Sequence, residues 1–361
     1  ISVVFVGPED PIVNGIYDFF KQDDLLKEVL VIAPGKIAAQ LEGSKDFAKV
    51  FMKKNNIPTA KYSTFSKKNI REGYGFLEEM NPPYVLKADG LAAGKGVLIL
   101  DNINEAKKEL ENMLINEKFG KASTRVVVEE FLQGIELSCF VLTNGQDYKI
   151  LPFAKDYKKI GEGDTGLNTG GMGAVSPVPF VDNEFKNKIE EKIIKPTIKG
   201  IRDEGMEYIG FIFIGLIKVN DEPYVIEYNV RMGDPETEVV FPRVKSDILE
   251  LLLSLETKKF PLFELDIDPR FSSTIMLVSG GYPLAYEKQI PITGLEDIKK
   301  AQVFHAGTKN LNNKIVTNGG RVLAVTSFGS TIKDATENCY KASNKIFFEG
   351  MYFRKDIGFD L

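Results

Sequence analysis

One stretch of alternating polar side chains offers oxygen ligands and a cation for a phosphorylated substrate. It has the sequence V-I-E-Y-N-V-R-M-G-D-P-E and runs from Val225 to Glu236. Successive side chains of a β-strand point to opposite faces, so Glu227, Asn229 and Arg231 share one face. Carboxylate and amide oxygens are ligands for Mg²⁺, and a planar guanidinium pairs with phosphate oxygens. This strand therefore predicts a site for a metal ion and a phosphate.

A second stretch predicts a backbone that approaches phosphates closely. It has the sequence K-A-D-G-L-A-A-G-K-G-V and begins at Lys87, with glycines at Gly90, Gly94 and Gly96. Glycine has no Cβ, so its backbone amides can come close to phosphate oxygens. Neither stretch is a Walker P-loop or a Rossmann fingerprint. Together they indicate a nucleoside triphosphate site of another kind.

The composition is that of a globular chain with more than one domain. The 361 residues are 43% hydrophobic and 27% charged, and 46 basic against 51 acidic residues give a net charge of −5. A chain of this length is expected to form two or three domains. The charge gives no overall attraction to nucleic acid, so no nucleic-acid partner is expected. No apolar run approaches the ~20 residues of a membrane span, and no signal peptide opens the chain, so the expectation is a cytoplasmic protein without a membrane partner.

The cysteines and the histidine give no sign of nucleophilic catalysis. Cys139 and Cys339 are far apart in the sequence, and both are expected to be reduced, buried thiols. His305 is the only histidine, and its F-H-A-G-T setting favours a structural or positioning role over a catalytic base. No Ser-His-Asp or Cys-His arrangement can be assembled around it.

The apolar periodicity predicts mixed α and β structure that begins with a parallel unit. Strands at residues 1–6 and 29–32 with a helix at 12–20 between them form a β-α-β unit. Further helices are expected at 44–55, 105–116, 182–203 with a bend or break at Pro196, 247–255 and 332–349. Further strands are expected at 84–88, 97–100, 125–131, 137–142, 149–153, 211–219, 224–228, 272–279, 301–305 and 321–327. Asn144-Gly145 and Asn220-Asp221 predict hairpin turns. The Pro-rich, acidic run at 260–269 is the expected domain boundary.

Several long motifs together resemble one enzyme family. They are G-P-E at Gly7, A-A-Q-L-E-G-S-K ending at Lys45, the glycine-rich stretch at Lys87, E-E-F-L at Glu129, N-T-G-G-M-G-A at Asn168, R-M-G-D-P-E-T-E at Arg231, F-H-A-G-T at Phe304, T-N-G-G-R-V-L at Thr317 and R-K-D-I-G at Arg354. The chain resembles the glycinamide ribonucleotide synthetases (phosphoribosylamine–glycine ligases) of the ATP-grasp superfamily over nearly its whole length. The resemblance implies that ATP drives the joining of 5-phosphoribosylamine and glycine through a glycyl phosphate, in de novo purine biosynthesis.

The resemblance also implies the architecture. The expected fold is α/β and α+β, multidomain, with an ATP-grasp domain between a partial doubly wound domain and a strand-rich C-terminal domain. The expected boundaries are 1–43, 44–258 and 270–361, with a mobile lid at about 61–129, and the expected state is a monomer. The family's usual G-x-G-G-R-E-H opening is absent. Since a doubly wound sheet needs further paired strands, roughly 60–80 residues are expected upstream of Ile1.

The resemblance assigns a role to each candidate residue. Glu227 and Asn229 would hold Mg²⁺ or Mn²⁺. Arg231 would clamp the transferred phosphoryl group, with a structural salt bridge as its alternative role. The residues expected to bind ATP are Lys45 and Lys87 at the phosphates, Gly90, Gly94, Lys95 and Gly96 in the lid, Glu129, Glu130 and Leu132 at the adenine, and Glu136 at the ribose. Asn168 and Gly170 belong to a loop expected to bind glycine and phosphoribosylamine through its amides.

Two other functions remain open from the sequence. One is a different ATP-grasp carboxylate–amine ligase or carboxylase of nucleotide metabolism, which the use of bicarbonate in place of glycine would reveal. The other is an ATP-binding module without ligase activity.

Overall fold

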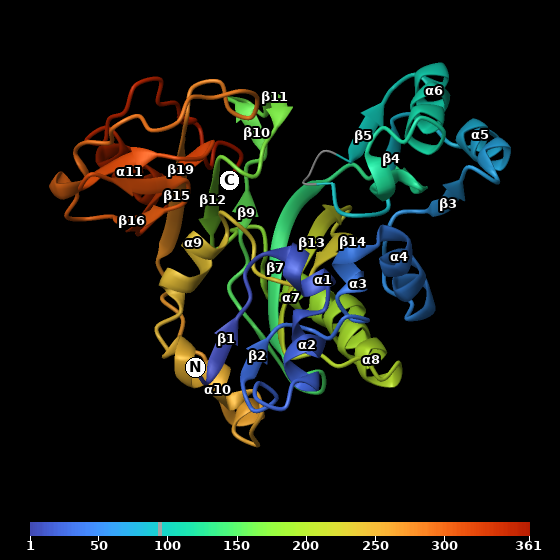
Figure 1. Cartoon of the computed structure of the whole chain (residues 1–361), viewed down its shortest axis with the longest axis horizontal. Helices are drawn as coiled ribbons and strands as arrows, with labels where there is room; N and C mark the ends of the chain where they lie inside the picture. Colours follow the sequence, from blue (N-terminus) through green and yellow to red (C-terminus); the bar gives the residue numbers. More distant parts are fainter. Residues whose placement is uncertain (93–95) are drawn as a thin grey trace. The chain divides into compact units, whose positions relative to one another are not determined.

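The chain folds into two compact units that interleave along the sequence. A computed structural model describes residues 1–92 and 96–361. Unit 1 comprises residues 1–150, 182–232 and 249–263, and unit 2 comprises 151–181, 233–248 and 264–361 (Figure 1). The three-domain division expected from the sequence stays a prediction.

The N-terminal part of unit 1 contains the expected parallel strand pair. Strand β1 (Val3–Phe5) pairs in parallel with β2 (Leu30–Ile32). The prediction of a single helix at 12–20 is wrong, because the chain forms α1 (Glu9–Val13) and α2 (Ile16–Gln22) instead. Gly15 separates them with a φ of 91°, a left-handed conformation that a continuing helix does not allow.

A short helix pair follows and carries the first candidate lysine. Helix α3 (Gln40–Gly43) leads into α4 (Lys45–Lys54), close to the helix expected at 44–55. The Ser44 hydroxyl accepts a hydrogen bond from the Phe47 amide at 3.1 Å, which caps the start of α4. Because residues four apart share a helix face, the side chains of Lys45 and Lys49 lie one above the other.

A four-stranded antiparallel sheet carries the second motif. Its strand order is β3-β6-β4-β5. The strands are β3 (Tyr62–Ser66), β4 (Tyr84–Ala88), β5 (Val97–Leu100) and β6 (Arg125–Glu130). Helices α5 (Ile70–Glu79) and α6 (Ile103–Leu114) pack on it through one apolar cluster that includes Leu77, Leu86 and Leu110, and the turn η1 (Gly120–Ser123) precedes β6 (Figure 1). The sequence did not predict β3 or α5.

A second antiparallel sheet of unit 1 carries the metal-site strand. Its strand order is β14-β13-β7-β8, with β7 (Ile135–Thr143), β8 (Tyr148–Ile150), β13 (Gly210–Val219) and β14 (Glu222–Asn229). Both expected hairpins are present, and Asn220 and Asp221 have φ values of 48° and 61°, as a tight hairpin turn requires. The helix expected at 182–203 comprises α7 (Asn183–Ile189), a π-helical turn η2 (Glu190–Ile194) and α8 (Lys195–Asp203), so its irregular turn comes just before Pro196. Unit 1 also includes all but the first residue of α10 (Ile248–Ser254), and η4 (Phe260–Leu262).

Unit 2 is built around a five-stranded sheet with the order β16-β19-β15-β12-β9. Its strands are β9 (Lys155–Asp156), β12 (Gly173–Ser176), β15 (Phe271–Val278), β16 (Gln302–His305) and β19 (Arg321–Gly329). Helix α11 (Ile332–Ser343) packs against β15 and β19 and ends before the position expected from the sequence. The remaining elements are the hairpins β10 (Lys159–Gly161) with β11 (Thr165–Asn168) and β17 (Thr308–Leu311) with β18 (Lys314–Thr317), and the short turns α9 (Thr237–Val240), η3 (Phe241–Arg243) and η5 (Leu295–Asp297).

The two cysteines are buried within the fold. Cys139 and Cys339 are free and buried, as expected. Burial raises the pKa of the Cys339 thiol to about 12, so this thiol stays protonated at neutral pH. Within residues 1–92 and 96–361, no helix is both long enough and apolar enough to cross a membrane.

Glycine is required between β6 and β7 for steric reasons. A Cβ atom at Gly134 would lie 2.1 Å from the Lys218 carbonyl oxygen, whereas one at Gly75 in α5 would meet nothing within 4 Å. We expect Gly134→Ala to lower the free energy of unfolding by about 1–3 kcal/mol, as overpacked sites do. Gly75→Ala should raise it by about 0.5–1 kcal/mol, because alanine favours helix. Urea titrations of both variants test this, and equal midpoints would contradict it.

Candidate nucleotide site

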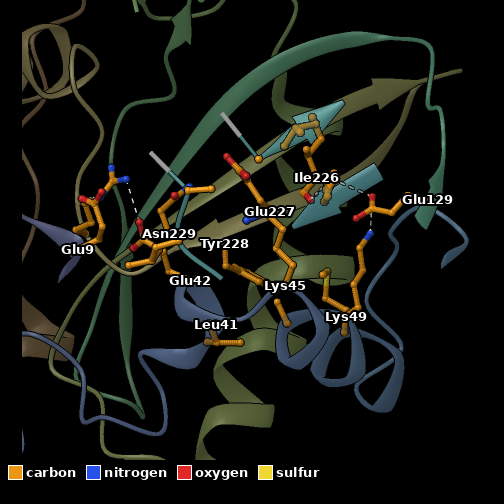
Figure 2. Close-up of a pocket in the computed structure, with 18 residues that line it drawn as sticks. Glu9, Leu41, Glu42, Lys45, Lys49, Glu129, Ile226, Glu227, Tyr228 and Asn229 are labelled. Carbon is orange, nitrogen blue, oxygen red and sulfur yellow. Dashed lines mark hydrogen bonds and ion pairs between the residues drawn. The ribbon is translucent and has the colours of Figure 1, made fainter. Parts of the chain in front are cut away.

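A pocket of unit 1 gathers most of the charged residues singled out from the sequence. Its volume is about 190 Å³. Its polar side chains come from helices α1, α3 and α4, from the small sheet, and from strand β14 with the residues just after it (Figure 2). The candidate residues that line it are Lys45, Lys87, Gly96, Glu129, Glu227, Asn229 and Arg231. Strands and helices far apart in the sequence thus place cations and oxygen ligands around one space.

Glu129 is the centre of a buried ionic cluster in this pocket. Its Oε2 lies 3.0 Å from the Nζ atoms of both Lys49 and Lys87, and all three side chains are less than 8% exposed. Burial opposes ionisation of Glu129, but the ammonium groups of Lys87 and Lys49 outweigh it and lower its pKa. One carboxylate therefore serves two cations, and its other oxygen, Oε1, is buried without a hydrogen-bond partner. The expected contact of Glu129 with adenine stays a prediction.

Lys49 is the pocket cation that the sequence analysis did not single out. Burial lowers the pKa of Lys49 from 10.5 to about 8, so the ammonium is still protonated at neutral pH. Its Nζ also donates to the Thr59 hydroxyl at 2.8 Å. The signal was its spacing of four residues from Lys45 on α4, which puts both lysines on one face. Figure 2 shows Lys49 directed toward Glu129.

Arg231 lies in an ion pair within the pocket. Its Nη2 is 2.9 Å from Glu42 Oε1, and its Nε is 3.4 Å from Glu9 Oε2. The second Glu42 oxygen accepts a hydrogen bond from the Val230 amide at 2.8 Å. The salt bridge considered as an alternative role is therefore present, and the side chain nevertheless lines the pocket.

Glu227 and Asn229 offer two oxygen ligands for a metal ion on one strand. No cluster of three His, Cys, Asp or Glu side chains able to hold a metal occurs among the residues that the structure describes. The protein thus supplies a partial set, which suits Mg²⁺ because this ion usually keeps waters and takes further ligands from phosphates. Asn229 is 8% exposed and its Nδ2 has no hydrogen-bond partner. A ligand with oxygen acceptors would satisfy this buried donor.

The aspartate of K-A-D-G ties the glycine-rich turn to α4. Asp89 Oδ1 accepts hydrogen bonds from the Ser44 hydroxyl at 2.8 Å and the Asp46 amide at 2.9 Å. Its Oδ2 is 2.8 Å from Arg125 Nη2. The next residue, Gly90, is also confined, since a Cβ there would lie 3.0 Å from Ala122 Cα. The start of this turn is therefore fixed by the same residues that begin the lysine-bearing helix.

Of the residues expected at the adenine and the ribose, Glu129 alone is among the described residues that line the pocket. Gly94 and Lys95 lie outside the described residues. Glu130, Leu132 and Glu136 are not among the described residues that line the pocket. The Glu130 carboxylate instead accepts a hydrogen bond from the Lys61 amide at 2.8 Å. The adenine and ribose contacts assigned to these residues stay predictions.

The glycine-rich loop that begins at Asn168 belongs to unit 2, and its amides already have partners. The amides of Gly170, Gly171 and Met172 donate to the Tyr282 hydroxyl at 3.0 Å, the Thr169 hydroxyl at 2.9 Å and the Tyr157 carbonyl at 2.7 Å. The expectation that these amides hold a substrate anion therefore finds no support in this arrangement. Any substrate contact of Asn168 or Gly170 stays a prediction.

Comparison with known proteins gives matches over nearly the whole chain. Residues 43–237 match a family described as phosphoribosylglycinamide synthetase, ATP-grasp (A) domain, and residues 272–360 match the C domain of the same synthetase. The phosphoribosylamine–glycine ligase of Vibrio vulnificus is 44% identical over 362 residues, which cover 99% of this chain and 83% of that protein.

Solved structures give the same result. A crystal structure of phosphoribosylamine–glycine ligase from Thermotoga maritima is 40% identical, with a TM-score of 0.83 over 91% of this chain and 81% of that one. The biotin carboxylase domain of 2-oxoglutarate carboxylase from Hydrogenobacter thermophilus, solved with MgADP, ADP and bicarbonate, has a TM-score of 0.74 at 18% identity over 97% of this chain and 75% of that one. At that identity the second likeness concerns the fold alone.

The Glu42 carboxyl should give the pocket a measurable pH dependence. Burial raises the pKa of Glu42 from 4.5 to about 7, against the opposing attraction of Arg231. At a pH between 4.5 and about 7, the Glu42 carboxyl keeps its proton in the folded chain but loses it in the unfolded chain. The contribution of Glu42 to the free energy of unfolding therefore decreases as the pH rises through this range. The free energy of unfolding of the wild type, minus that of Glu42→Gln, should fall by up to about 1.4 kcal/mol per pH unit in this window and then level off. Denaturant titrations across the window test this, and a flat or rising difference would disprove it.

Proposed function

The chain belongs to the phosphoribosylglycinamide synthetase family, and we propose that it joins glycine to 5-phosphoribosylamine, driven by the conversion of ATP to ADP and phosphate. The observation that carries this proposal is the pocket of unit 1, which is lined by three lysines together with the oxygen atoms of Glu227 and Asn229. Such a set of side chains suits a nucleotide with its metal ion. We also propose that this enzyme is cytoplasmic and monomeric and acts in purine biosynthesis.

The chemistry needs a leaving group on the glycine carboxylate. At neutral pH this carboxylate is unreactive toward an amine, so one oxygen must first be phosphorylated by ATP. The amine of phosphoribosylamine then attacks the glycyl phosphate carbonyl, the amide bond forms and phosphate leaves. In such a reaction the protein contributes positions and opposite charges rather than a covalent bond.

Different pocket residues have different roles in this reaction. Lys45 and Lys87 neutralise the phosphates, and Lys49 acts through Glu129, which holds the Lys87 ammonium in place. Glu227 and Asn229 would hold Mg²⁺ or Mn²⁺, whose charge helps to stabilise the phosphoryl group during transfer. Fixed charges of this kind cost no rearrangement at the moment of reaction.

The proposal assigns Arg231 to the transferred phosphoryl group. Its guanidinium lines the pocket and is held by Glu42 and Glu9, so it is oriented before any ligand arrives. A planar cation of this type binds phosphate oxygens through two parallel hydrogen bonds. The N-T-G-G-M-G motif supports assigning the recognition of glycine and phosphoribosylamine to the loop of Asn168 and Gly170, through groups other than the loop amides that already have partners.

The direct test is substrate-dependent release of ADP by the purified full-length protein. ADP should appear only when glycine, freshly prepared phosphoribosylamine and Mg-ATP are all present, and mass spectrometry should detect the glycinamide ribonucleotide. Replacement of glycine by bicarbonate should give no release. Release with bicarbonate would instead support a carboxylase, and nucleotide binding without any turnover would support a binding module.

The metal assignment has its own test. We expect Glu227→Gln and Asn229→Ala each to lower kcat by about 10²–10³-fold at moderate Mg²⁺, because the first removes a carboxylate charge and the second an amide oxygen that would hold the metal ion. Glu222→Gln is the matched control, since this residue starts the same strand and pairs with Lys188 and Lys192 rather than lining the pocket. Near-normal turnover in either pocket variant would refute the metal site.

A further inference from the structure

We propose that Arg321 is a positioning residue that holds the N-T-G-G-M-G loop against the G-D-P-E turn for the ligase reaction. This inference rests on the proposed function, because both segments carry candidate substrate or phosphate motifs. Arg321 belongs to T-N-G-G-R-V-L, a motif to which the proposed chemistry assigns no role. All the residues involved lie in unit 2.

The Arg321 guanidinium joins the two segments directly. Its Nη1 donates to the Gly170 carbonyl at 2.6 Å and to the Asp234 carbonyl at 2.8 Å. Its Nη2 lies 3.1 Å from Asp234 Oδ2. One side chain therefore contacts the backbone of both segments and a carboxylate of the second. The rigid fork of an arginine can do this, whereas a lysine ammonium cannot reproduce its geometry.

The other polar group of Gly170 is held by a second residue of the same unit. The Gly170 amide donates to the Tyr282 hydroxyl at 3.0 Å. Both backbone polar groups of this glycine are thus engaged by side chains from the C-terminal part of the chain. The loop is therefore fixed at its first glycine by two independent contacts.

Close packing explains why the loop has glycines at these positions. A Cβ at Gly170 would lie 2.9 Å from Arg321 Cζ, and one at Gly171 would lie 2.4 Å from Pro235 Cδ. The φ of Gly171 is also 113°, a conformation that favours glycine. A side chain at Gly171 would force the loop away from the G-D-P-E turn, and one at Gly170 would displace the Arg321 guanidinium from its contacts.

The backbone of Arg321 is held in a paired β-strand, so its side chain can position the loop. Arg321 begins β19, which pairs with β15 and β16 in the central part of the sheet. Its carbonyl also accepts a hydrogen bond from the Gly307 amide at 2.9 Å. A side chain anchored on a paired strand restrains a loop more effectively than one that comes from another loop.

The test compares Arg321→Gln with a matched control, Arg270→Gln. Arg270 also pairs with an aspartate of unit 2, Asp268, but its side chain is 58% exposed. In wild type and both variants, kcat and KM are measured for each substrate, together with the affinity for Mg-ADP. Hydrogen exchange is followed in peptides that cover residues 165–175. Arg321→Lys and Tyr282→Phe complete the series.

We expect Arg321→Gln to lower kcat/KM for glycine and phosphoribosylamine by about 10²-fold, as displaced reacting groups do, with unchanged affinity for Mg-ADP. Exchange at 165–175 should accelerate while strands β15 and β19 stay protected. Arg321→Lys should recover only part of the activity, and Arg270→Gln should match the wild type. If Arg321→Gln does not fold, faster exchange at 165–175 in Tyr282→Phe and Arg321→Lys supports the proposal.

The proposal is overturned if Arg321→Gln shows the same hydrogen exchange and kinetics as the wild type. If Arg321→Gln does not fold, the same result in both Arg321→Lys and Tyr282→Phe overturns it. A uniform loss of protection across the sheet would also overturn it, because that result marks a purely structural role. If the wild type shows no ADP release dependent on glycine and phosphoribosylamine, the proposed function fails instead. The exchange measurement then still decides whether Arg321 holds the loop.

Discussion

Two buried ammonium groups share one buried carboxylate at the centre of the pocket, and much of unit 1 is arranged around them. Lys49, Lys87 and Glu129 come from α4, β4 and β6, and together they carry one excess positive charge away from water. An ammonium without a full partner is costly to bury, so an anionic ligand gains from entering this space. Substitution of Glu129 would leave both lysines without their carboxylate. This would lower the free energy of unfolding more than the loss of an ion pair at the surface. The ion pairs that join the small sheet to α4 therefore also leave a positive charge that favours an anionic ligand.

Local patterns in the sequence predicted those elements whose conformation depends on a few neighbouring residues. Asn144-Gly145 and Asn220-Asp221 predicted their hairpins because left-handed backbone favours Asn, Asp and Gly. The apolar strands at 84–88 and 97–100 were predicted with the bounds that the structure has. The motifs also led to the family, and the ATP-grasp fold is confirmed by the match over residues 43–237.

The elements that were missed depend on tertiary contacts. Helix α5 contains Gly73 and Gly75, which lower its intrinsic propensity, and it forms because its apolar face packs on the small sheet. The helix expected to reach residue 349 ends at Ser343, and Phe348 beyond its end packs in the core of unit 2. Lys49 was missed because its burial and its shared carboxylate are properties of the folded chain. The ion pair of Arg231 was weighed from the sequence, but its partners Glu9 and Glu42 were visible only in three dimensions.

The order of strands in unit 2 limits how this protein can be divided or recombined. Strand β15 pairs with β19 on one side and with β12 on the other, although β12 comes from a distant part of the chain. A fragment that begins at residue 264 would keep β19 and α11 but lose β12 and β9. One side of β15 would then be an open row of unpaired backbone groups, which invites pairing with another molecule. Gene fusions or exchanges of modules among relatives must therefore transfer residues 151–181 together with the C-terminal segment.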